Sequence, residues 1–493
     1  MNTTQAHPEV VQSEDVLSRQ EQRSQPLYTG RVKVYPKAIK GRVRRVKWAV
    51  LGLCLAVYYL LPWVRWDRGP NLPDQAVLLD LPNRRFYLFW IEIWPQEIYY
   101  LTALLIIASF TLFMATSIGG RVWCGFTCPQ TVWTDLFMKV EHWIEGDRNA
   151  RMRLDAQPLS RAKLTRKLAK HAVWLLIALL TGGAWIMYFV DAPHLVAGFV
   201  TGGLDPVTYF FIFLFTATTY VLAGAAREQV CTYMCPWPRF QAALLDEDSL
   251  VVTYRQWRGE PRGKHKKGQS WEGRGDCIDC KQCVAVCPTG IDIRDGIQLE
   301  CIGCGLCIDA CDSVMAKVDR PLGLIAFDSD RNQRLNAAGQ PPVSRRSRLV
   351  RPRTIIYAFL ITGITLALLT ALTLRSQLDV NVLHDRNPLF VTLSDGSIRN
   401  GYTIHVINMG QDERMMTLTV DGLPEAQITV VGAEQDDAVS AQLDVTSDAV
   451  LTYRVFVSVP AAVLQENATD IAFVFHDTDS GLVSSHDSVF RGP

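Results

Sequence analysis

Two consecutive cysteine runs constrain this chain more than any other feature of its sequence. Each run has the spacing Cys-x-x-Cys-x-x-Cys-x-x-x-Cys, and the eight residues are Cys277, Cys280, Cys283, Cys287, Cys301, Cys304, Cys307 and Cys311. In bacterial [4Fe–4S] proteins, the first three thiolates of such a run hold one cluster and the fourth reaches the other cluster. We therefore assign the first cluster to Cys277, Cys280, Cys283 and Cys311, and the second cluster to Cys301, Cys304, Cys307 and Cys287.

Zinc knuckles and a disulfide framework are the alternative interpretations of so many cysteines. Zinc sites usually pair two Cys-x-x-Cys units across a longer loop, and they lack the third and fourth spacings found here. One departure from the pattern is that Asp312 stands where the first run has Pro288. The repeated spacing still favours two iron–sulfur clusters, so the chain is expected to move electrons one at a time.

Five uncharged apolar stretches indicate that the clusters belong to a membrane protein. They run at about residues 48–64, 98–118, 172–190, 207–226 and 354–374. Four of them are close to the ~20 residues that a helix needs to cross the hydrocarbon core, and the first is shorter. We therefore predict a transmembrane bundle of five helices. A further helix, at Thr131–Glu145, is predicted to be amphipathic and to lie at the membrane surface.

The distribution of charge predicts how the bundle is oriented. Lys and Arg crowd residues 31–47, 119–170 and 250–353, whereas Asp191–Asp205 contains neither. From Asp379 onward there are seventeen acidic residues, five Arg and no Lys. Because positively charged loops stay in the cytoplasm, we expect the N-terminus and the clusters inside and the C-terminal domain outside. The basic residues flank apolar spans, so we expect no nucleic acid as a partner.

A second cysteine constellation lies next to the predicted spans. Cys124 and Cys128 follow the second span, Cys231 and Cys235 follow the fourth, and each pair reads Cys-x-x-x-Cys-Pro. A four-residue step on a helix brings two side chains onto one face. At one membrane depth, the two pairs could converge into a site with up to four sulfurs. Soft thiolates select Cu(I) and also suit zinc or another iron–sulfur centre, while buried packing is the alternative for either pair.

The remaining segments complete a multi-domain membrane protein. Strand-like stretches beyond residue 379 are separated by Gly, Asp and Pro turns, which suggests an all-β sandwich of immunoglobulin type. The expected order is a disordered and basic N-terminus (1–45), a four-helix region with both Cys-x-x-x-Cys-Pro motifs (46–250), a ferredoxin-like 2[4Fe–4S] domain (251–325), a linker (326–353), the fifth transmembrane helix (354–374) and the Ig-like domain (379–493).

Missing motifs disfavour several other redox and nucleotide functions. The core of each predicted span lacks histidine, and a membrane b-type haem needs axial ligands there. The sequence also lacks a Gly-x-Gly-x-x-Gly motif after a strand and a Walker lysine motif, so direct NAD or ATP chemistry is not expected.

With both cysteine sets and the five-span layout, the chain closely resembles the FixG/RdxA/CcoG family of cytochrome c oxidase accessory proteins. The resemblance runs from about residue 30 to the end and includes the segments Val122–Gln130, Gln229–Arg239, Gly275–Cys280 and Pro321–Ile325. It implies a factor of the bacterial inner membrane that supports assembly of cbb3-type oxidase by reducing Cu(II) to Cu(I). The copper-handling residues would then be Cys124, Cys128, Cys231 and Cys235.

This resemblance implies a set of partners. They are copper ions, cbb3-type oxidase assembly factors or copper chaperones and transporters, and a cytoplasmic electron donor, and a homodimer is left open. The alternative function is a membrane ferredoxin relay that oxidises quinol, as in the NapH/NosR group, which shares the Cys-x-x-x-Cys-Pro pairs. A third is a scaffold whose clusters are only structural, with the Ig-like domain as the functional part.

Overall fold

The computed structural model describes residues 33–69, 72–265, 268–344, 349–375, 378–410, 412–432, 438–464, 466–478, 481 and 483–493. It divides into two compact units, of which the first comprises residues 1–66 and 73–362 and the second residues 67–72 and 363–493. The predicted disorder of residues 1–30 lies outside the described residues.

Within the described residues, five helices are long and apolar enough to cross a membrane, as the sequence predicts. With their flanking turns they span Arg42–Trp63, Pro95–Gly119, Arg161–Ile186, Pro206–Ala226 and Pro352–Thr373. Their α-helical parts are α2 (Arg42–Leu60), α3 (Ile98–Gly119), α6 (Arg161–Ile186), α8 (Pro206–Thr219) and α15 (Pro352–Thr373). The 22 residues of α3 extend over ~33 Å, enough for a hydrocarbon core of ~30 Å. The first helix begins at Arg42, earlier than predicted. The prediction counted only uncharged residues, whereas the first turns of this helix carry Lys and Arg.

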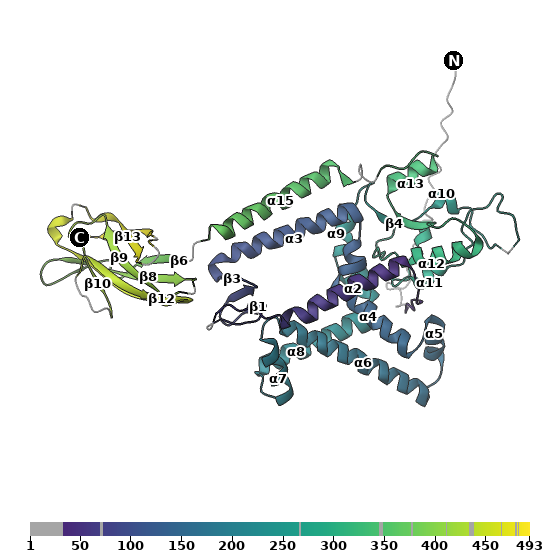
Figure 1. Ribbon diagram of the computed structural model, residues 1–493, viewed down its shortest axis with the longest axis horizontal. Helices are drawn as coiled ribbons and strands as arrows, with labels where there is room; N and C mark the ends of the chain where they lie inside the picture. The colour runs from purple at the N-terminus through teal and green to yellow at the C-terminus, as the bar shows by residue number, and fades with distance from the viewer. Residues whose placement is uncertain are drawn as a thin grey trace, which may run out of the picture. The chain divides into compact units, whose positions relative to one another are not determined.

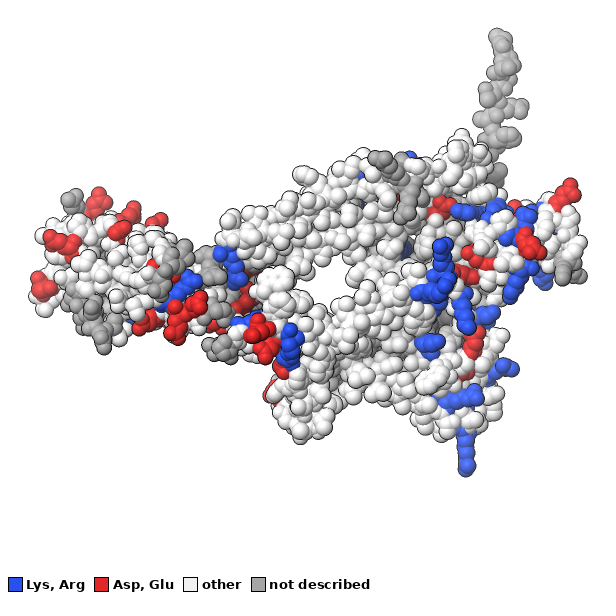
Figure 2. Space-filling view, in the orientation of Figure 1, with Lys and Arg blue, Asp and Glu red and all other residues white. Residues whose placement is uncertain are grey.

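Shorter elements cover the two ends of these helices in the first unit. At one end lie the hairpin sheet β1 (Val77–Asp80), β2 (Arg85–Leu88) and β3 (Ile91–Ile93) and the helix α7 (Ala192–Thr201). The ferredoxin-like elements lie at the other end, as Figure 1 shows. Figure 2 shows an almost uncharged band over the helices of this unit, with Lys and Arg gathered at the ferredoxin end. These Lys and Arg residues belong to the basic segments 31–47, 119–170 and 250–353 of the sequence.

The ferredoxin-like module is closed by a small two-stranded sheet. Its elements are β4 (Val251–Tyr254), α10 (Gln256–Gly259), α11 (Gln282–Val286), α12 (Leu306–Met315), β5 (Ile325–Asp328) and α13 (Asp330–Ala337). Antiparallel pairing of β4 with β5 joins the two ends of the module. The segment expected as a linker therefore contains the end of β5 and the whole of α13, which Ser329 caps by accepting from the Asn332 N–H.

The helix predicted at the membrane surface is α4 (Pro129–Ile144), and it is more enclosed than its apolar pattern indicated. It packs against α6 and against the segment that follows α8. Phe137 and Val140 are buried there, but so are Asp135 and Glu141. Both carboxylates form ion pairs with Lys or Arg from other elements, so α4 is an internal connector at the ferredoxin end of the helices. The short helices α5 (Arg148–Ala156) and α9 (Trp237–Leu244) complete this end.

The second unit contains the predicted β-sandwich. One sheet has the order β10 (Gln427–Val430), β12 (Ala449–Val459), β8 (Ile398–Asn408) and β6 (Leu378–His384), with β7 (Val391–Thr392) paired to β8. The other has the order β11 (Ser440–Val445), β9 (Arg414–Asp421), β13 (Ala468–Asp477) and β14 (Val483–Arg491).

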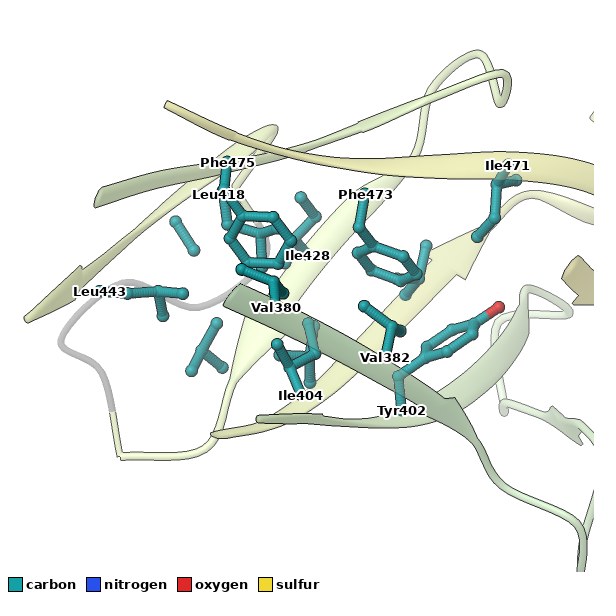
Figure 3. Packing of buried hydrophobic residues seen from close by; sticks show 14 of the residues in the cluster. Val380, Val382, Tyr402, Ile404, Leu418, Ile428, Leu443, Ile471, Phe473 and Phe475 are labelled. Atoms are coloured by element: carbon teal, nitrogen blue, oxygen red, sulfur yellow. The ribbon is translucent and has the colours of Figure 1, made fainter. Parts of the chain in front are cut away.

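Alternate side chains of both sheets form the core of this sandwich. Burial alternates along β8, as expected where one face of a sheet meets another sheet. Figure 3 shows Ile404 and Tyr402 facing Phe473 and Phe475 across the interior. The Tyr402 hydroxyl donates to the Val489 carbonyl at 3.0 Å, which satisfies the only polar atom of this fully buried side chain.

Candidate redox site

The first Cys-x-x-x-Cys-Pro motif forms a π-helical turn between α3 and α4. The turn covers Trp123–Thr127 and contains Cys124. The Cys128 N–H donates to the Trp123 carbonyl at 2.8 Å, which closes the turn. Pro129 then occupies the first position of α4, where a missing N–H costs nothing. The motif therefore ends one helix and begins the next.

The second motif repeats this local structure. After α8, the chain continues as a π-helical segment, Tyr220–Ala226, and a further π turn covers Val230–Met234. The Cys235 N–H donates to the Val230 carbonyl at 2.8 Å, which matches the bond that closes the first turn. The four-residue spacing predicts an ordinary α-helical turn between the two cysteines of each pair. Both turns are π-helical instead, and they are therefore wider than an α-helical turn.

Side chains from α4 and α9 hold the two motifs against each other. The Gln130 amide donates to the Leu222 carbonyl at 2.8 Å and to the Arg227 carbonyl at 3.2 Å. The Cys124 thiol donates to the buried Gln241 side chain of α9 at 3.0 Å. The first motif and Gln130, the residue after it, are thus bonded to the segments that precede and follow the second motif.

The four thiols of the two motifs lie together. Burial, and then the nearby thiols of Cys128 and Cys231, raises the pKa of Cys124 to about 12. Burial, Cys128 and Cys235 likewise raise the pKa of Cys231 to about 11. The structure therefore brings together the four predicted residues, although no three His, Cys, Asp or Glu side chains among the described residues stand at ligand spacing around a single ion.

The eight cysteines of the ferredoxin-like module lie close to one another, and the crossed ligand assignment stays a prediction. Burial raises the pKa of Cys311 to about 12, with further contributions from the three leading thiols of the first run, Cys283, Cys277 and Cys280. Burial also raises the pKa of Cys307, and its strongest thiol neighbours are Cys304, Cys301 and Cys287. Eight thiols in two groups of four fit two [4Fe–4S] clusters, since each cluster takes four thiolates.

The four-thiol site lies against the loop of the second run. Cys124 packs in one apolar cluster with Ile302, Cys304 and Leu306, and Cys231 and Cys307 lie at its edge. The backbones also touch, because a Cβ at Gly125 would lie 2.8 Å from the Gly303 carbonyl oxygen. A glycine is therefore required at position 125, and the sulfur site and the cluster loop are in direct contact.

Several residues around this site escaped prediction from the sequence. Glu141 of α4 forms ion pairs with Arg151 and Arg227, both buried. Lys170 of α6 reaches the same carboxylate at 3.7 Å. The sequence signal for Glu141 was an acidic residue within an otherwise apolar helical pattern. It could not identify the partners of Glu141, because they are distant in the sequence. Arg121, three residues before Cys124, lies within the basic segment 119–170, and no sequence signal indicated that its side chain contacts a cysteine loop.

Comparisons with known proteins identify the family. A 4Fe–4S dicluster domain matches residues 226–330, a 4Fe–4S binding domain matches residues 100–150, and the Ig-like fold at the C-terminus of FixG matches residues 368–493. The nitrogen fixation protein FixG of Rhizobium meliloti is 50% identical over 480 residues, covering 92% of each chain. The chain belongs to the FixG/RdxA family.

Two further members of the FixG/RdxA family come from Cereibacter sphaeroides. Protein RdxA is 52% identical over 439 residues, which covers 89% of this chain and 91% of that protein. Protein RdxB is 48% identical over 471 residues, which covers 94% of this chain and 97% of that protein. Together with the 4Fe–4S domains and the five apolar helices, this membership makes the chain a membrane iron–sulfur redox protein.

Proposed function

We propose that this protein is a membrane-bound cupric reductase that supplies Cu(I) for assembly of a cbb3-type cytochrome c oxidase. The observation that carries the proposal is the convergence of Cys124, Cys128, Cys231 and Cys235 against the loop of the second cysteine run. An iron–sulfur protein with a separate soft-ligand site beside one cluster loop has the parts for one-electron reduction of a soft metal ion.

The two sets of cysteines have different roles in this proposal. Eight cysteines of the ferredoxin-like module would hold two [4Fe–4S] clusters, which store and release single electrons when bound. The four other thiols would take copper as substrate, and because thiolates favour Cu(I) over Cu(II), they make its reduction easier. One electron converts one Cu(II) to one Cu(I), and a cytoplasmic protein or cofactor of low potential would supply it.

A test of this function separates the two cysteine sets. The protein is reduced anaerobically by dithionite and desalted before Cu(II) is added. The variant with Ala at positions 124, 128, 231 and 235 should then lose Cu(I) formation, measured with a Cu(I)-specific chelator. Its iron and sulfide content and its cluster absorbance should match those of the wild type, which controls for folding. Undiminished Cu(I) formation in this variant would remove copper from the site.

A cavity near the first motif favours quinol oxidation as a second candidate function. Its volume is about 320 Å³, and aromatic residues line it. These include Tyr58, Trp133 and Trp185, and the cavity reaches Gln130, two residues after Cys128. Apolar pockets with a few polar groups suit small aromatic ligands. Reduction of the clusters by a short-chain quinol, without any need for copper, would favour this candidate over the first.

The cellular setting is part of the same proposal. We place the protein in a bacterial inner membrane, with the ferredoxin-like module in the cytoplasm, where thiolate ligands stay reduced. The Ig-like domain would then face the periplasm and bind a copper chaperone, a transporter or an oxidase assembly factor. Pull-down of such a protein by the full chain, lost when residues 379–493 are removed, would test this arrangement.

A further inference from the structure

One buried arginine connects the two sulfur sites. Arg121 lies between the end of α3 and the first π turn and is 7% exposed. Its Nη1 atom donates to the Leu299 carbonyl and to the Cys301 carbonyl, the latter at 2.7 Å. Its Nη2 atom donates to the Pro238 carbonyl of α9 at 3.1 Å. This side chain therefore joins the first motif, the segment after the second motif and the loop of the second cysteine run.

The backbone around Arg121 is packed as closely as its side chain. A Cβ at Gly303, which has φ +69°, would lie 3.0 Å from the Arg121 Cβ. The neighbouring contact of Gly125 with the Gly303 carbonyl lies in the same interface. Since glycine is present on both sides, the Arg121 segment and the Cys301–Cys307 loop approach at backbone distance.

Arg121 forms no direct ion pair with a carboxylate among the described residues. Other buried arginines are ion-paired, as Arg151 is with Glu141 and Arg294 is with Asp292. Arg121 instead bonds only carbonyl oxygens. Burial lowers the pKa of Arg121, and the electrostatic effects of Cys301, Cys124 and Glu300 oppose that shift. A buried cation is costly without negative charge nearby, so the sulfur sites on either side, together with the Glu300 carboxylate, are the groups that can balance it.

We propose that Arg121 is a positioning residue for electron exchange between the two sulfur sites: its guanidinium fixes the Cys301 loop against the four-thiol site and supplies a buried positive charge there. The copper part of this inference rests on the proposed function. The charge part does not, since it concerns only the cluster held by the Cys301 run.

The expected consequence follows from electrostatics. A positive charge beside a redox group favours the state with one more electron, and in a poorly solvated site the effect is large. Loss of the charge should therefore lower the reduction potential of the group on the Cys301 run. The group on the Cys277 run lies beside Arg294 instead and should keep its potential. One electron still leaves the protein for each Cu(II) reduced to Cu(I).

The experiment uses the full chain, purified anaerobically in detergent, with the variants Arg121→Gln and Arg121→Lys. An electron paramagnetic resonance redox titration measures both cluster potentials, and iron and sulfide analysis checks that the clusters are present. In Arg121→Gln, one potential should fall while the other stays, and Cu(I) formation by the dithionite-reduced and desalted protein should slow by roughly tenfold or more. Arg121→Lys should restore most of the potential but not the rate, because an ammonium group cannot make the same fork of bonds.

Two further variants separate charge from position. Gly125→Ala adds a methyl group against the Gly303 carbonyl and should slow Cu(I) formation with both potentials unchanged. Arg294→Gln serves as the matched control at the other run and should lower the other potential. Unchanged potentials in Arg121→Gln would overturn the proposal. If Arg121→Gln loses its clusters, a wild-type rate of Cu(I) formation in both Arg121→Lys and Gly125→Ala would also overturn the proposal. If the wild type forms no Cu(I), the proposed function fails, while the potentials still decide the role of Arg121.

Discussion

Glu141 shows at the residue scale how a charged group can hold a membrane protein together. Its carboxylate is 2% exposed and meets two arginines and one lysine from other elements. Burial alone would raise its pKa, but the Arg227 and Arg151 guanidinium groups outweigh burial and hold the pKa below its usual value. Because Arg227 stands four residues before Cys231, this carboxylate also anchors the second motif to α4.

Replacement of Glu141 by Gln should destabilise the protein strongly. The substitution leaves buried guanidinium groups without an anion, and breaking a buried pair in this way costs about 3–5 kcal/mol. Thermal unfolding in detergent, followed by tryptophan fluorescence, measures the loss. Arg334→Gln is the control, because the Arg334–Asp330 pair is exposed and is worth about 0.3–0.5 kcal/mol. Equal midpoints for the two variants would contradict this role.

The low pKa of Glu141 also predicts how stability depends on pH. A carboxyl whose pKa is lower in the folded state than in the unfolded state binds its proton less readily when folded. Its contribution is therefore complete above the unfolded pKa and is lost as pH falls through the folded pKa. Wild-type protein should lose more stability than Glu141→Gln on acidification below about pH 4.3, the ordinary pKa of a glutamate. Parallel pH curves for the two proteins would show that Glu141 is not ionised in the fold.

At the element scale, one glycine face sets the distance between α6 and α8. A Cβ at Gly182 would lie 2.7 Å from the Thr216 backbone nitrogen, whereas a Cβ at Gly183 would meet nothing within 4 Å. Gly182→Ala should force the helices apart and cost about 1–3 kcal/mol, as overpacking of an interior does. Gly183→Ala is the matched control and should change the midpoint of thermal unfolding little. A neutral Gly182→Ala would mean that the helices are not packed at this distance.

Elements whose signal is local were predictable from the sequence, and those that depend on distant partners were not. Five spans could be read from hydropathy, and the iron–sulfur domain could be read from the spacing of its cysteines. The π turns at Cys124 and Cys231 could not, since a wider turn differs from an α-helical turn only in its tertiary setting. The same limit explains Glu141, which is separated from Arg227 by 86 residues, and Arg121, whose acceptors are carbonyl groups.

At the scale of the whole molecule, an odd number of spans predicts that the two termini face opposite sides of the membrane. Among the described residues, four helices of sufficient length precede the ferredoxin-like module, and a fifth, α15, separates that module from the β-sandwich along the chain. Alkaline phosphatase fused to residue 493 should be active, and green fluorescent protein at the same position should stay dark. The reverse result, or phosphatase activity of a fusion at the N-terminus, would contradict the predicted orientation.

The central claim is that electrons held by the ferredoxin-like module pass to copper at the four thiols. An anaerobic titration of the dithionite-reduced and desalted protein with Cu(II) tests it most directly. The absorbance of the oxidised clusters should return in proportion to the copper added, with one Cu(I) formed for each electron released. The variant with Ala at positions 124, 128, 231 and 235 should be reoxidised far more slowly. Clusters that stay reduced in the presence of Cu(II), or that respond equally in the variant, would contradict the claim.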